Sequence, residues 1–309
     1  MWDAYVAGGR AAGRCIGLIV VLYIIGAAVV AVFGTAVWLT VEHMLDGALA
    51  TRTLLTDLDA NVFLDLIVHK SDSLRGLGLA GLVVAGGALI LYVWLNAALI
   101  VAVAGAVNVR TSLRRGWGLF PTFVSLWGLA LAAVTVLLGL DWLTVRLVTQ
   151  WAAARGTGPP PLLVAAVGGA AAVVGLLVLV AAHDHARIRA AATGGGPIRA
   201  WAWGWRFVWQ RRTEALPLVG LLALTAAAVW AVFGGLQWSV VPTTATRVTL
   251  VLIAAQLAAL ARLVMRAWWF GAETALQRRA AGLAQDREGC DRRRGGAGSG
   301  GDPTRGRYV

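Results

Sequence analysis

The chain has 309 residues, of which 59% are hydrophobic and only 14% are charged, and its formal net charge is +12. A soluble globular domain carries about 25% charged residues, so this composition excludes a water-facing surface over most of the chain. The mean hydropathy of +0.74 likewise excludes disorder over most of its length. The composition therefore predicts a polytopic membrane protein.

Six apolar runs are long enough to cross a bilayer, since a spanning helix needs about 20 mostly apolar residues. They lack the alternation of barrel strands, so each is expected to be a helix. We predict an all-α fold in which residues 1–281 form a six-helix transmembrane domain. The predicted spans are Ile16 to Thr40, Leu77 to Val107, Trp117 to Leu140, Pro161 to Ala182, Ala215 to Trp238 and Val248 to Phe270.

The basic residues are distributed unevenly between the connections. Of the 27 Lys and Arg residues, 19 lie before the first span or after the second, fourth and sixth, and 6 lie in the other connections. Lys and Arg are retained on the cytoplasmic side, so both termini are expected in the cytoplasm. The single Lys and the abundance of Arg, Ala and Gly suggest a GC-rich bacterial genome, and hence the bacterial cytoplasmic (inner) membrane. The charge of +12 then reflects an asymmetry between two membrane faces, and no nucleic-acid partner is expected.

Small residues form a stripe along the fourth predicted span. Ala165, Gly168, Ala172 and Gly175 follow one another at spacings of 3, 4 and 3, which is one helix face. Close contact between helices drives their association in lipid, so this face is expected to pack on a neighbour. The alternative is that Ala and Gly are simply abundant in this chain.

Ionisable residues within spans are costly, which makes them candidates for a role. Arg262 and Arg266 lie four residues apart on one face of the sixth span, and Asp184 follows the fourth span at similar depth. We expect Asp184 to form an inter-helix ion pair with Arg262 or Arg266. The alternative is that each arginine extends separately to the lipid headgroups.

Two uncharged polar residues, Asn96 and Gln256, also lie within spans. They are candidates for a polar path through the membrane, and the alternative is that they make hydrogen bonds between helices. The chain has no HExxH, GxSxG, GxxxxGK[ST] or CxxC motif, so no catalytic residue and no cofactor is expected. No metal site is expected either, because His183 and His185, two apart, point about 200° away from each other on a helix.

Two connections have an amphipathic pattern. The outer loop 41–75 has an apolar stripe and a polar face, which predicts a helix lying on the membrane; the alternative is a cation or solute site using Asp65, His69 and Asp72. The inner segment 197–214 is rich in Trp and Arg, which favour headgroups and anionic lipid. Its predicted lipid-interface residues are Trp201, Trp205, Arg206, Trp209, Arg211 and Arg212. The Gly- and Arg-rich tail 282–309 is predicted to be disordered.

The run DHARIR, which starts at Asp184, and the run RFVWQR, which starts at Arg206, resemble those of a loose group of uncharacterised six-span bacterial integral membrane proteins. The resemblance implies a fold and a membrane location, with no assigned activity. The sequence favours a non-enzymatic structural, assembly or interaction protein. The alternative is a small transporter or permease that uses a polar path between helices.

Overall fold

The computed structural model describes the chain except for residues 45–70, 106–107, 156–160, 240–244 and 298–309. The described residues form helices only, without a strand. In chain order they are α1 (Trp2–Arg14), α2 (Ile16–Met44), α5 (Ser71–Val103), α6 (Val109–Arg155), α7 (Pro161–Thr193), α8 (Pro197–Gln210), α9 (Arg212–Ser239) and α10 (Ala245–Ala297).

Six of these helices contain a stretch long and apolar enough to cross a membrane, which confirms the predicted all-α, multi-pass class. Three of the six, α6, α7 and α10, extend well beyond the predicted spans because charged residues flanking an apolar run do not interrupt a helix. The candidate spans are Ile16–Thr35, Gly81–Val103, Val109–Ala154, Leu162–Thr193, Arg212–Ser239 and Thr246–Gly282.

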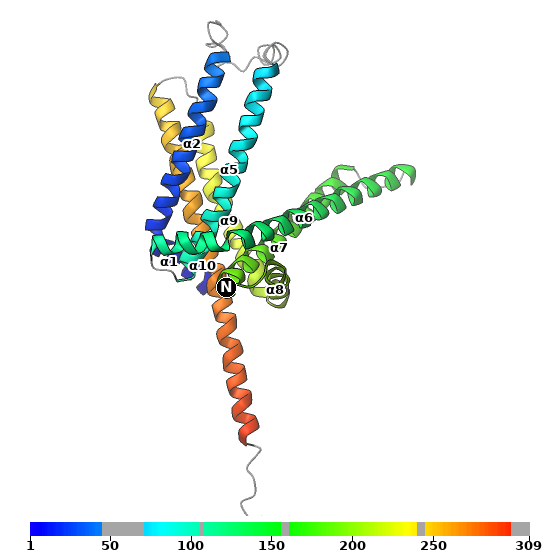
Figure 1. The fold of residues 1–309 in the computed structure, drawn as a ribbon. Helices are drawn as coiled ribbons and strands as arrows, with labels where there is room; N and C mark the ends of the chain where they lie inside the picture. The colour runs from blue at the N-terminus through cyan, green and yellow to red at the C-terminus, as the bar shows by residue number, and fades with distance from the viewer. Residues whose placement is uncertain (45–70, 106–107, 156–160, 240–244, 298–309) are drawn as a thin grey trace, which may run out of the picture.

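Helices α2, α5, α9 and α10 run side by side, while α6 and α7 form a hairpin that leans away from them (Figure 1). The main core gathers where α2, α5, α6, α7 and α10 meet, around Ile19, Ile100, Phe123 and Phe270. Large apolar side chains farther along the helices are exposed, as at Leu162, 82% exposed. Such exposure is expected of surfaces that face lipid.

Helix α10 continues to Ala297 and projects from the bundle (Figure 1), whereas the sequence predicts disorder from residue 282. Leu, Ala, Gln, Glu and Arg, all strong helix formers, occur between residues 283 and 294 and favour continuation of the helix.

The short helix α1 was not foreseen in the sequence and packs along α10. The two backbones approach closely at Gly8, where an added Cβ would lie 2.5 Å from the carbonyl oxygen of Trp268 and 2.7 Å from the nitrogen of Ala272. The indole Nε1 of Trp268 donates a hydrogen bond of 2.8 Å to the carbonyl oxygen of Tyr5. Only glycine fits at position 8 without separating the two helices.

The predicted small-residue stripe of α7 faces α6. A Cβ added at Gly168 would lie 2.5 Å from Cγ2 of Val145, and one added at Gly175 would lie 3.0 Å from Leu137. Ala172, between them, is buried, while Ala165 at the end of the stripe is exposed. Most of the stripe therefore serves the α6–α7 contact.

Candidate functional site

A cluster of buried polar side chains lies where α5, α7 and α10 meet. Helix α7 contributes Asp184 and Arg187, each 1% exposed, and α10 contributes Glu273, 0% exposed. Arg266 of α10 reaches the same place with a side chain that is 26% exposed. Burying a charge costs free energy unless the charge is paired, so the ion pairs within this cluster affect the stability of the bundle.

Asp184 is the centre of the cluster. Its Oδ1 accepts a hydrogen bond of 2.9 Å from Nη1 of Arg187 and a longer one, 3.4 Å, from Nη2 of Arg266. The structure thus brings Asp184 and Arg266 together, as one of the two sequence hypotheses proposed. Arg262 is exposed, and among the described residues the ion pairs of Asp184 are with Arg187 and Arg266.

Aromatic rings cover both guanidinium groups of the cluster. Arg187 lies over the rings of Phe123 and Phe270, with 5.5 Å and 5.1 Å to the ring centroids, and Arg266 lies 4.4 Å from the centroid of Phe270. A ring face attracts a cation, most strongly where water is excluded. Phe270 therefore stabilises the two arginines that share one carboxylate.

Sequence reasoning missed Arg187 and Glu273, because both lie past the ends of the predicted spans. Arg187 follows Asp184 by three residues, a spacing that brings side chains together on a helix. Glu273 follows Arg266 by seven residues, two helical turns, and its Oε1 accepts a hydrogen bond of 3.0 Å from Nε1 of Trp269. Both spacings are visible in the sequence, but burial is not.

Asn96 and Gln256, the candidate polar path, are held apart by separate partners. Asn96 donates to the carbonyl oxygen of Tyr92 at 2.7 Å and accepts from Nε of Arg266 at 3.3 Å. Gln256 accepts a hydrogen bond of 2.6 Å from the hydroxyl of Tyr23. Asn96 lines a small pocket of about 70 Å³ together with Arg262 and Arg266, and Gln256 is not part of it.

The two histidines of α7 have different surroundings. His185 is fully buried, and its Nδ1 lies 2.9 Å from Nε2 of Gln277, which also donates to the carbonyl oxygen of His185. His183 meets the ring of Trp201 edge to face at 5.9 Å. Within the described part of the chain, no group of three or more His, Cys, Asp or Glu residues is arranged to hold a metal ion.

The inner Trp- and Arg-rich segment forms α8 and the start of α9. Helix α8 begins after the left-handed Gly194 and packs on α7, where Gly204 leaves no room for a Cβ against the carbonyl oxygen of Ala182. Arg211 forms an ion pair of 3.1 Å with Glu214. The exposure of the six predicted lipid-interface residues varies: Trp201, Trp205 and Arg211 are half-buried, and Arg206, Trp209 and Arg212 are exposed.

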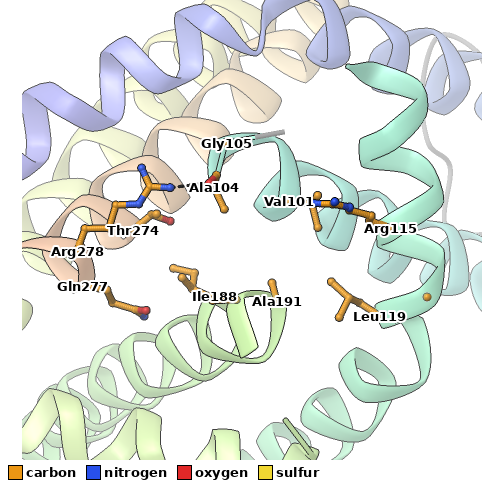
Figure 2. Close-up of a pocket in the computed structure, with 12 residues that line it drawn as sticks. Val101, Ala104, Gly105, Arg115, Leu119, Ile188, Ala191, Thr274, Gln277 and Arg278 are labelled. Atoms are coloured by element: carbon orange, nitrogen blue, oxygen red, sulfur yellow. Dashed lines mark hydrogen bonds between the residues drawn. The ribbon is translucent and has the colours of Figure 1, made fainter. Parts of the chain in front are cut away.

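A cavity of about 740 Å³ lies beside the cluster, bordered by α6, α7, α10 and the end of α5 (Figure 2). Arg115 of α6 and Arg278 of α10 lie on opposite sides of it, with Ile188 and Ala191 of α7 along one wall. We call it the inner cavity because Arg115 and Arg278 belong to connections predicted to be cytoplasmic. This cavity was not predicted, since its walls come from four helices that are separate in the sequence.

Asp65 and His69, which the sequence named as candidates for an outer cation or solute site, lie outside the described residues, as does the side chain of Asp72.

Comparison with protein-family models, with curated proteins and with solved structures found no match to this chain. The site therefore has to be interpreted from its own chemistry.

Proposed function

We propose that the chain is a non-enzymatic structural, assembly or interaction protein of the bacterial cytoplasmic membrane. The observation that carries this proposal is that polar side chains within its apolar helices join one helix to another. Asp184 and Asn96 both bind Arg266, which joins α7 and α5 to α10. Bonds of this kind fix the packing of a bundle.

A transporter needs a polar path near the middle of the membrane, and the geometry gives little support for one. The pocket beside Asn96 has a volume of about 70 Å³ and does not reach Gln256. A water molecule occupies about 30 Å³ in the liquid, so this pocket accommodates a few waters at most. We therefore favour the structural role over transport.

The proposal includes an orientation and a lipid contact. The termini lie in the cytoplasm, and the exposed Arg206, Trp209 and Arg212 face the anionic headgroups of the inner leaflet. Each Arg near an anionic surface contributes on the order of 1 kcal/mol, and Trp prefers the headgroup layer. Nucleic acid has no part in this proposal.

Labelling of introduced cysteines with a membrane-impermeant maleimide tests the proposal. Both natural cysteines are first replaced, in the variant C15A/C290A. Single cysteines are then introduced at Asn96 and at Gln256, with Leu257 as the matched control, because it is 50% exposed and apolar. The reagent is applied to intact cells and to inverted membrane vesicles.

The structural role predicts that N96C and Q256C react no faster than L257C from either side. Faster labelling at both positions would establish a water-accessible path and overturn the proposal in favour of transport. The exposed Thr193, at the end of α7, supplies the orientation test. T193C should react in inverted vesicles only, and labelling in intact cells would refute the proposed orientation.

A further inference from the structure

We propose that the inner cavity binds a phosphate group carried on an apolar body. The proposal concerns a binding site and goes beyond the structural role argued above, so either one can fail without the other. It rests on the charge of the cavity, on an unpartnered buried hydroxyl, and on the apolar walls.

The charge of the cavity is positive. Within the described residues its lining includes Arg115 and Arg278 and no carboxylate. Both arginines are exposed, so their guanidinium groups are accessible to a ligand. Arg278 donates one hydrogen bond of 2.5 Å, from Nη2 to the carbonyl oxygen of Ala104. A guanidinium group has five N–H donors, so others remain available. The remaining donors match the geometry of phosphate oxygens, which arginine binds in bidentate fashion.

A second observation points to the same wall. Thr274 lies four residues before Arg278 and therefore on the same face of α10. It is 5% exposed and lines the cavity, and its hydroxyl has no hydrogen-bond partner among the described residues. Buried hydroxyl groups normally have a partner, so this one is available to donate to an anion. Figure 2 shows Thr274 and Arg278 on the same side of the cavity, across from Arg115.

The rest of the cavity defines the body that carries the phosphate. Val101, Leu119, Ile188 and Ala191 give it apolar walls. Its volume of about 740 Å³ is within the usual range for small-molecule sites, roughly 300–1,000 Å³, and far exceeds a bare phosphate ion. The shared chemistry is that of a phosphate ester, whose source is either a lipid headgroup or a soluble phosphate monoester.

The test uses the full-length protein in detergent micelles and three probes. Dioleoyl phosphatidic acid carries phosphate and apolar chains, dioleoylglycerol carries the chains alone, and glycerol 3-phosphate carries the phosphate alone. Binding is measured by native mass spectrometry and by the shift of the thermal unfolding midpoint, followed through tryptophan fluorescence. We expect phosphatidic acid to be retained and to raise the midpoint, and dioleoylglycerol to do neither.

The chain offers a control that matches the test variant in charge. R115Q/R278Q removes the two cavity arginines, and R114Q/R279Q removes their exposed neighbours in sequence, which do not line the cavity. A hydrogen bond to a charged group is worth about tenfold or more in affinity, so the cavity variant should bind phosphatidic acid about 100-fold more weakly. The control variant should bind it as the unmodified chain does, because Arg114 and Arg279 do not line the cavity. An attraction that depends on net charge alone would instead weaken equally in both variants.

Thr274 provides an independent variant that leaves every charge in place. T274V should fold at least as stably as the unmodified chain, since it removes an unpartnered buried hydroxyl, but should bind phosphatidic acid about threefold to tenfold more weakly. T274S, which keeps the hydroxyl, should retain more of the affinity. An unchanged affinity in T274V would contradict the role of this side chain.

Competition identifies the source of the phosphate. Displacement of bound phosphatidic acid by millimolar glycerol 3-phosphate assigns the site to soluble phosphate monoesters, and failure to displace it assigns the site to lipid headgroups. The proposal is overturned if the two double variants lose affinity equally, or if dioleoylglycerol binds as well as phosphatidic acid.

Discussion

Replacing Asp184 by Asn should destabilise the bundle more than any neighbouring charge substitution. D184N keeps the shape of the side chain but removes the charge that pairs with Arg187 at 2.9 Å and with Arg266 at 3.4 Å. Arg187 is 1% exposed and loses its ion-pair partner. Leaving one member of a buried pair without its partner costs about 3–5 kcal/mol.

Two arginine variants, R266Q and R262Q, provide a comparison for the loss of stability in D184N. R266Q leaves Asp184 paired with Arg187, and the side chain that it removes is 26% exposed and makes the longer contact. Its cost should therefore be about 1.5 kcal/mol, at the low end for a charged hydrogen bond. R262Q removes an exposed arginine one turn away and should cost about 0.5 kcal/mol or less.

The assay is unfolding of the purified protein in mixed micelles as sodium dodecyl sulfate is added, followed by tryptophan fluorescence. The unfolding midpoint should fall in the order R262Q, R266Q, D184N, with D184N the least stable. Equal midpoints for D184N and R262Q would refute the reasoning, because the carboxylate would then make no net contribution to the bundle.

Exchanging the two charges should not restore stability. D184R/R266D places a second arginine three residues before Arg187 on α7, where like charges repel. Recovery of the unmodified midpoint in this double variant would mean that Arg187 does not share the carboxylate, contrary to the observed geometry.

Two further predictions concern the N-terminal part of the chain. G8L should separate α1 from α10 and lower the free energy of unfolding by about 1–3 kcal/mol. G13L, at a glycine with open space around it, should lower it less. Equal losses of thermal stability in the two variants would contradict the close approach at Gly8. Burial raises the pKa of the Cys15 thiol, an effect that Arg14 partly offsets. In the variant C290S, Cys15 should therefore react with iodoacetamide at pH 8 several-fold more slowly before unfolding than after it, and equal rates would show that the thiol is accessible.

The sequence predicts the presence of the apolar spans better than it predicts the ends of the helices. The six spans are properties of local composition, and a run such as Ile16 to Thr35 is identified without knowledge of its neighbours. Helix ends are less well determined, since Arg110 and Asp141 lie outside the predicted third span yet within α6. The charges that close an apolar run mark where lipid ends, which is a different boundary from the end of the helix.

The cluster around Asp184 was predicted only in part from the sequence. Asp184 lies at a depth in the membrane similar to that of Arg262 and Arg266, which predicted an ion pair between two helices. The two arginines share one helix face, so their spacing alone did not show which of them forms the pair. Arg187 was overlooked because an arginine beyond an apolar run is normally solvated at the membrane surface. Packing of Phe123 and Phe270 around it makes it a buried residue instead.

By itself the sequence determined that this chain is an all-α protein with six helices able to cross a membrane, because apolar length is a property of each segment alone. The tertiary structure decided that Arg266 meets both Asp184 and Asn96, and where a cavity opens between Arg115 and Arg278. Those features depend on how four helices are rotated and spaced against one another. That information arises only when segments distant in the sequence are packed together.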